Sequence, residues 1–522
     1  MKRKILISFI LAALTVASRI PFICKYLFDW DSILLARALD GFYIPAHRPH
    51  PPGYIFSVLS AKLLYFIFDA NTAYIVLGIF FAAITAILIW RIMDRFVPTT
   101  VAFLAALIWI TSPLSWFWSS VSATYIISPA FAALLMWFSV KFDSSRRPVF
   151  YSFMVGLTVG IASGFRQDLT LLLGVPTIWF IFTKLEYGFS RIFLSVLAGF
   201  ALPFAVWFGL SSANCGGVSE YIDIVRGQFG VSVGGGKFGQ ASFRIMLGLK
   251  RLVAGLLLGG GAAILPAVAA IIVRPITIIK SLWESKSRSP GMFLIMIAFP
   301  VLFFVFVFLA KSGYVLILLP PTIVVSIICI HNSLLRGKTG FSTRLLLAVV
   351  IIDTAMALFL PASSYPRFYT FPGDIRQTYD RYIAANTLIS LRDYERRMDE
   401  VTGPVQRDNP AGRTVLLLPY ERGFFGLRHA QYYFENYPII VLYRPGFKLY
   451  YNFDLLGEYE ENAVVLSREI DRVLIISGTF DRSKLVGGEL IESRRIFDID
   501  IAAIENRNSI TYDGFRIIRE TP

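Results

Sequence analysis

One short stretch of the chain gathers side chains that can take, give or bind protons and anions. The segment FDWDSILLARALDGFYIPAHRPHPPGYIF at 28–56 contains two of the four histidines of the protein. A carboxylate in such a loop can act as a general base. Arg or protonated His can stabilise a negatively charged phosphate. The candidates all fall within 22 residues, and they are Asp29, Asp31, Asp40, His47, Arg48 and His50.

Local sequence signals indicate how these side chains are held. Apolar residues follow Asp31 at Ile33–Leu35, Ala38 and Leu39, which predicts a short amphipathic helix along the membrane surface with Asp31 at its start. The element PHPPGY precedes the next apolar run, and proline is favoured in a first helical turn because it has no N–H to leave unpaired. A stiff backbone at this point should give His50 a defined position.

Long apolar stretches recur through the first 361 residues. Of 522 residues, 56% are hydrophobic and 16% charged, whereas soluble domains hold roughly 45–50% and about 25%. A membrane crossing needs about 20 apolar residues. The first stretch could be a cleavable signal peptide, but we favour an uncleaved helix. We expect a polytopic α-helical membrane protein with 11–13 transmembrane helices, and the twelve candidates lie near 5–22, 54–70, 72–91, 98–113, 121–141, 148–163, 169–186, 190–211, 252–273, 291–310, 313–331 and 344–361.

The charge distribution predicts a topology. The net charge is +15, but residues from Ala362 onward hold 21 Lys and Arg against 23 Asp and Glu, which leaves 29 against 12 before them. Basic loops are retained in the cytoplasm, so the tail is expected outside it, and the charge gives no support to nucleic-acid binding. A cytoplasmic start and an external tail need an odd number of crossings. Either 54–70 with 72–91 contains a non-spanning piece, or a further crossing exists.

The tail differs in character from the membrane module. Its apolar runs are short, as in TVLLLPY, IIVLY and VLIISG, and a polar helical stretch runs from about Asp380 to Glu400. This alternation predicts a soluble extracytoplasmic α/β domain at 362–522 after a membrane module at 1–361. The three cysteines, Cys24, Cys215 and Cys329, show no metal-binding or disulfide spacing, so we predict neither a metal nor a cofactor.

Two further outer loops follow from this topology. FRQDL at 165–169 places Arg166 and Asp168 between apolar segments, where charges are costly and often functional, although a plain loop ion pair explains them as well. The long outer loop 212–250 is rich in glycine near Gly234 and lacks the spacing of a nucleotide-binding loop.

These residue types suit a glycosyl transfer at the membrane surface. An acceptor hydroxyl must lose a proton as the anomeric carbon becomes positive, and Asp31 or Asp29 can take that proton. Arg48, His50, His47 and Arg166 could stabilise a departing lipid phosphate. The simpler explanation is that the acids are only solvated and that HPPG starts a helix.

The segment resembles the GT-C glycosyltransferases, a family that includes protein O-mannosyltransferases and aminoarabinose transferases. The matching residues are Asp31 in DWDSILLARAL and the histidine-proline-proline element in HRPHPPGY. The resemblance covers roughly residues 19–60. It implies that Asp31 is the base, that the donor is a polyprenyl-phosphate sugar, that transfer inverts the anomeric centre and that the site faces away from the cytoplasm. Many members carry Asp-Glu where this chain has Asp29-Trp30-Asp31, so either aspartate could be the equivalent residue.

We therefore expect a membrane glycosyltransferase whose partners are a lipid-linked sugar donor, membrane lipids and a lipid, glycan or protein acceptor. The alternative is a transporter or flippase for a lipid-linked sugar or glycan. A transporter should show broken helices in matching halves with midplane charges, whereas the polar residues here cluster in one outer loop. A non-catalytic assembly protein would tolerate replacement of Asp31.

Overall fold

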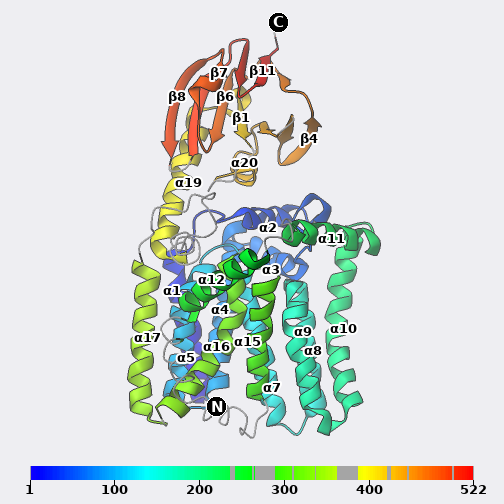
Figure 1. Ribbon diagram of the computed structural model, residues 1–522, viewed down its shortest axis with the longest axis vertical. Helices are drawn as coiled ribbons and strands as arrows, with labels where there is room; N and C mark the ends of the chain where they lie inside the picture. Colours follow the sequence, from blue (N-terminus) through cyan, green and yellow to red (C-terminus); the bar gives the residue numbers. More distant parts are fainter. Residues whose placement is uncertain are drawn as a thin grey trace. The chain divides into compact units, whose positions relative to one another are not determined.

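A computed structural model describes most of the chain as two units (Figure 1). The described residues are 2–234, 241–260, 264, 289–307, 311–335, 337–360, 386–419, 425–443, 446–496 and 499–520. One unit comprises Met1–Tyr365 with Phe371–Leu391, and the other Pro366–Thr370 with Arg392–Pro522. The domain boundary expected at 361–362 falls in the segment 361–385, which lies outside the described residues. Its position therefore stays a prediction.

The first unit is helical and apolar, as an integral membrane protein requires. Within the described ranges, seven helical spans are long and apolar enough to cross a membrane, and four apolar helices are shorter. These eleven fit a polytopic membrane protein, but the expected span at 252–273 lies mostly outside the described residues. The elements are α1 Lys2–Arg19, α2 Trp30–Asp40, α3 Ile55–Tyr65, α4 Ala70–Met93, α5 Thr99–Thr111, α6 Pro113–Trp118, α7 Ser128–Asp143, α8 Pro148–Phe165, α9 Asp168–Thr183, α10 Phe189–Asn214, α11 Val218–Gly234, α12 Ala241–Gly260, α15 Ser289–Phe306, α16 Leu319–Ile328 and α17 Thr339–Phe359.

Helices α2 and α11 lie across one end of the upright helices, at the end opposite to the N-terminus (Figure 1). The loop expected at 212–250 is thus largely helical, since α10 continues to Asn214, α11 follows and α12 starts at Ala241. Residues 235–240 of the glycine-rich part lie outside the described residues. Helix α2 is more buried than a helix lying on a membrane surface would be, because seven of its eleven residues are buried.

Helix α3 is the non-spanning piece that the topology requires. At roughly 16 Å it is too short for about 30 Å of hydrocarbon. Both of its ends also contact the same end of the bundle, because Ser57 donates to the carbonyl of Phe165 at the end of α8, and Tyr65 donates to Asp40 at the end of α2. Removing this segment from the twelve sequence candidates leaves eleven, an odd number. The candidate at 252–273 lies mostly outside the described residues, so the number of crossings and the external tail stay predictions. The prolines also precede α3 and do not form its first turn, because the helix starts only at Ile55.

Helices α8 and α10 pack side by side and parallel, with backbones in close contact at glycines. A Cβ added to Gly199 would lie 2.2 Å from the carbonyl oxygen of Phe153, and one added to Gly156 would lie 1.9 Å from that of Val196. Small residues permit such close approach of helices in a membrane. This pair therefore fixes the position of α8, whose far end carries Arg166.

We predict that Gly199→Ala destabilises the protein while Gly209→Ala in the same helix does not. The added methyl at Gly199 must displace backbone, an overpacking that costs about 1–3 kcal/mol. At Gly209 no atom lies within 4 Å of the added methyl. Thermal unfolding of the two variants in detergent, followed by intrinsic fluorescence, measures the difference. Equal melting temperatures would show that the two helices are not packed as described.

The second unit is an α/β domain, as its sequence predicts. The three apolar runs TVLLLPY, IIVLY and VLIISG form neighbouring parallel strands, with β1 between β2 and β6. The polar helical stretch corresponds to α19 Leu388–Asp408, and its expected start at Asp380 falls outside the described residues. A seven-stranded sheet has the order β4-β3-β2-β1-β6-β9-β8, and a four-stranded sheet has the order β5-β11-β10-β7. The bounds are β1 Thr414–Pro419, α20 Leu427–Tyr433, β2 Ile439–Leu442, β3 Phe447–Tyr451, β4 Asp454–Tyr459, β5 Ala463–Leu466, β6 Arg472–Ser477, β7 Leu485–Val486, β8 Glu489–Ile496, β9 Ile499–Glu505, β10 Ser509–Tyr512 and β11 Phe515–Arg519.

Candidate active site

Asp29 and Asp31 are held by the first turn of α2. Asp29 is the N-cap, and its Oδ1 accepts from the backbone N–H of Ser32 at 2.9 Å and from the Ser32 hydroxyl at 3.0 Å. Asp31 lies within the first turn, where the helix dipole favours a negative charge. The helix therefore starts at Trp30, directly after its cap, and Asp31 lies at its start as expected. One oxygen of Asp29 is committed to the cap, so Asp29 has a structural task that Asp31 lacks.

Lys311 joins the two carboxylates, although it lies 280 residues after Asp31 in the sequence. Its Nζ donates to Asp29 Oδ2 at 2.6 Å and to Asp31 Oδ2 at 2.5 Å. Partial burial opposes the charge of Asp31, but Lys311 and His50 outweigh this effect and hold the pKa of Asp31 well below its ordinary value. The same carboxylates raise the pKa of Lys311 despite its burial. Asp31 is consequently a carboxylate at neutral pH, in the form that can accept a proton.

The other oxygen of Asp31 faces His50, which lies in the proline-rich segment before α3. His50 Nδ1 lies 3.9 Å from Asp31 Oδ1, and His50 Nε2 lies 3.1 Å from the hydroxyl of Tyr54. Burial lowers the pKa of His50. The separation from Asp31 is longer than a hydrogen bond, so the imidazole lies near the carboxylate without a direct hydrogen bond to it. The carboxylate has a third neighbour in Tyr125, whose hydroxyl donates to Asp31 Oδ2 at 3.3 Å.

Arg166 forms a second positive centre in the same pocket. Its guanidinium donates to both oxygens of Asp168, at 3.2 and 2.8 Å, and to the hydroxyl of Thr124 at 3.1 Å. Burial acts to lower the pKa of Arg166, but Asp168 outweighs it and the net pKa is raised. The guanidinium also lies 4.6 Å from the ring centroid of Tyr125 and 5.3 Å from that of Tyr314. A fixed cation flanked by aromatic rings is suited to an anionic group attached to a sugar.

One narrow pocket collects most of these side chains. Its lining includes Asp29, Asp31, His50, Tyr54, Tyr125 and Arg166. The side chains of Asp31 and Lys311 are each 33% exposed, so solvent or a ligand can reach the ion pair. Within the described ranges, no group of three or more His, Cys, Asp or Glu side chains could hold a metal ion.

The sequence candidates divide into two groups. Asp29, Asp31, His50 and Arg166 line the pocket, and Asp168 reaches it through Arg166. His47 and Arg48 are absent from this lining. They belong to a tight turn in which the Arg48 backbone exchanges hydrogen bonds with Tyr43. The expected role of His47 and Arg48 in phosphate binding stays a prediction.

Lys311 was not among the sequence candidates, although a signal for it exists. It is a single cation between the apolar segments 291–310 and 313–331, and the charge pattern places its loop on the outer face with Asp31. Charges next to membrane-spanning segments are frequently functional. Tyr54, Tyr125 and Tyr314 gave no such signal, because aromatic residues are frequent throughout this chain.

Comparison of the whole structure with known structures identifies the fold. Two crystal structures of ArnT from Cupriavidus metallidurans, one bound to undecaprenyl phosphate and one in the apo state, align with a TM-score of 0.58 at 10% sequence identity. Each alignment covers 96% of this chain and 97% of ArnT. The chain has a GT-C fold.

The GT-C fold here includes both the helical unit and the C-terminal α/β domain. The archaeal oligosaccharyltransferase AglB from Archaeoglobus fulgidus also aligns, with a TM-score of 0.45 at 11% identity over 80% of this chain and 62% of AglB. No protein-family model and no curated protein matches the sequence. Sequence identity of this size establishes shared architecture only, so residue roles must come from the geometry of the pocket.

Proposed function

We propose that this protein is a membrane glycosyltransferase that uses a polyprenyl-phosphate-linked sugar and has Asp31 as its base. The observation that carries the proposal is the ionised carboxylate of Asp31, which faces His50 and Lys311 in a pocket between helices of a GT-C fold. Support for the donor class comes from ArnT, which is described as bound to undecaprenyl phosphate. The pocket and the C-terminal domain lie outside the cytoplasm in this proposal, consistent with the positive-inside pattern.

The reaction is a single displacement at the anomeric carbon. Asp31 takes the proton from the attacking acceptor group as the new bond to the anomeric carbon forms. The bond between that carbon and the phosphate oxygen breaks, and the lipid phosphate leaves with the electron pair. Attack from the face opposite to the phosphate inverts the anomeric centre. General-base assistance of this kind contributes roughly 10²- to 10⁴-fold.

Lys311 and Arg166 stabilise the leaving phosphate. A phosphate that enters the pocket competes with the two aspartates for the Lys311 ammonium, which sits on a long flexible stem. When the Lys311 ammonium moves from Asp31 to the phosphate, Asp31 Oδ2 becomes free to take the proton of the attacking acceptor group. Arg166 is held rigidly by Asp168, so it supplies a fixed positive charge beside the rings of Tyr125 and Tyr314.

The proposal is tested by incubating purified protein with a panel of polyprenyl-phosphate sugars that differ in the sugar. Release of free polyprenyl phosphate from at least one donor, dependent on an acceptor extract of the cell envelope, is expected. A transporter would instead move a labelled donor across the wall of a reconstituted vesicle without consuming it. Translocation of intact donor, with no release of polyprenyl phosphate from any donor, would favour the transporter.

A further inference from the structure

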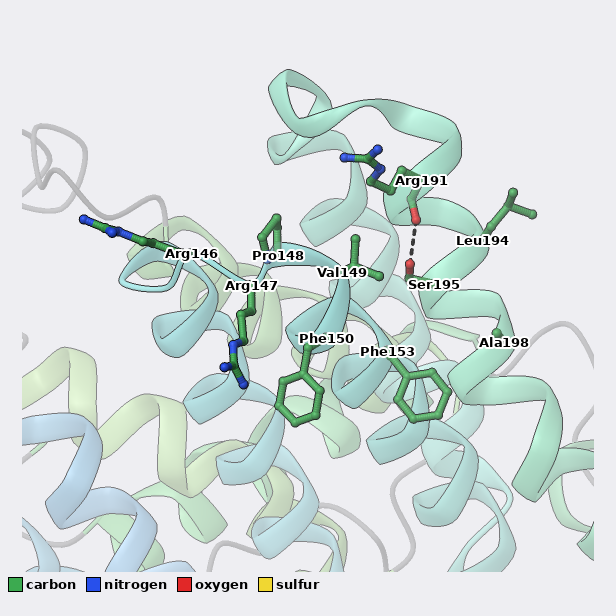
Figure 2. A pocket seen from close by; sticks show the side chains of 10 residues that line it. All are labelled: Arg146, Arg147, Pro148, Val149, Phe150, Phe153, Arg191, Leu194, Ser195 and Ala198. Atoms are coloured by element: carbon green, nitrogen blue, oxygen red, sulfur yellow. Dashed lines mark hydrogen bonds between the residues drawn. The ribbon is translucent and has the colours of Figure 1, made fainter.

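An open groove of about 910 Å³ lies between the starts of α8 and α10, far from the pocket (Figure 2). The 18 residues of α8 separate the groove from Arg166 by roughly 27 Å, so the groove lies at the other end of the helical unit. Lys4 of α1 and Asp94 after α4 form an ion pair, at 3.1 Å, at the same end as the N-terminus. The volume is within the range of ligand pockets, about 300–1,000 Å³.

Three arginines and no acidic residue line this groove. Arg146 and Arg147 precede α8, and Arg191 lies in the first turn of α10. All three are exposed, and within the described part of the chain none has a carboxylate within 4.0 Å. Two other cations at this end are paired, Lys4 with Asp94 and Lys184 with Asp143. The groove thus carries three arginine charges that no described carboxylate within 4.0 Å compensates.

Apart from Ser195, whose hydroxyl donates to the backbone carbonyl of Arg191, the remainder of the lining is apolar. Phe150 is 52% exposed and Leu194 58% exposed, and Phe153 lies between the two helices. Figure 2 shows Arg146 reaching away from the start of α8, Arg191 near Pro148, and Arg147 beside the ring of Phe150, with Phe153 farther along α8. Helices α8 and α10 run parallel, so the positive ends of both helix dipoles add to the arginine charge. A ligand with an anionic head group followed by a hydrocarbon chain matches this groove, which has a basic end and an apolar continuation.

We propose that this groove binds an anionic glycerophospholipid of the cytoplasmic leaflet. Its phosphate contacts the guanidinium groups of Arg147 and Arg191, and its acyl chains cover Phe150, Phe153 and Leu194. Basic pockets between transmembrane helices on the cytoplasmic side bind anionic headgroups in this way. The site is independent of the proposed glycosyl transfer, because it lies at the opposite end of α8 and shares no residue with the pocket.

The test is lipid binding to the full-length protein in a neutral detergent, measured by native mass spectrometry and by thermal shift. Phosphatidylglycerol is compared with phosphatidylcholine of the same acyl chains and with glycerol phosphate, which lacks acyl chains. The variants are Arg147→Gln with Arg191→Gln, and Phe150→Ser. The matched control is Lys2→Gln with Arg3→Gln, which removes the same charge from exposed positions at the same end.

Wild-type protein is expected to bind phosphatidylglycerol at least tenfold more tightly than phosphatidylcholine. The double arginine variant should lose on the order of 30-fold in affinity for phosphatidylglycerol. Phe150→Ser should lose a smaller factor, and the control should match wild type. Equal binding of the two lipids, or an equal loss in the control variant, overturns the proposal. Stabilisation by glycerol phosphate as strong as that by the lipid also overturns it, because the ligand would then be a soluble phosphate.

Discussion

Asp31→Asn is expected to reduce sugar transfer by roughly 10³-fold without weakening donor binding. The amide keeps the shape of the carboxylate but cannot accept a proton, and general-base assistance contributes about 10²- to 10⁴-fold. Its oxygen can still accept hydrogen bonds from Lys311 and Tyr125. The measurement is the rate of polyprenyl phosphate release under saturating donor, together with donor affinity from equilibrium binding.

Asp29→Asn separates the two aspartates and is expected to cost only about tenfold. Asn is as good an N-cap as Asp, so the start of α2 should persist, and the loss comes from the weaker contact with Lys311. Asp40→Asn, in the last turn of the same helix, is the matched control and should retain full activity. A large loss in Asp29→Asn with little loss in Asp31→Asn would make Asp29 the base. Undiminished turnover in both variants would show that neither aspartate is the base.

Lys311→Met is expected to lower turnover about 100-fold and to change its dependence on pH. In the wild type Lys311 helps to hold the pKa of Asp31 below its ordinary value, so the base stays ionised well into the acid range. Without the ammonium, the pKa of Asp31 loses the influence that lowers it and rises, and repulsion by the neighbouring Asp29 carboxylate adds to the rise. The variant should therefore lose activity as pH falls through a range in which the wild type is unaffected.

Lys311→Arg is the matched control for charge, because it keeps the cation while changing its shape. We expect it to keep the wild-type acid limit and to lose turnover only moderately, since a guanidinium cannot reproduce the position of the ammonium between two carboxylates. The measurement is turnover as a function of pH for the wild type, Lys311→Met and Lys311→Arg. If the acid limit of Lys311→Met coincides with that of wild type, Lys311 does not set the ionisation of Asp31.

The bridging position of Lys311 also limits when the base can work. Both carboxylates share one ammonium, and burial makes any unpaired charge in this pocket costly. When the Lys311 ammonium leaves the carboxylate of Asp31, the arriving phosphate becomes its new negatively charged partner. The proposed mechanism thus couples the presence of a donor to the release of the base, and it leaves the empty pocket in a neutralised state.

The sequence alone determined the features that depend on neighbouring residues. Apolar length predicted a polytopic membrane protein, and three short apolar runs predicted the central strands β1, β2 and β6. The density of polar groups around Asp29, Asp31 and His50 indicated the segment that forms most of the pocket. Each of these signals is local, because hydropathy and helix-start chemistry are set within a few residues of the chain.

The tertiary structure decided which distant side chains meet. Lys311 reaches Asp31 across 280 residues, and Tyr125 and Arg166 join the pocket from the ends of other helices. It also showed that α3 returns to the end at which it starts. His47 and Arg48, close in sequence to His50, lie outside the pocket. Such pairings depend on how whole helices pack, and no pattern within one segment records the position of a partner hundreds of residues away.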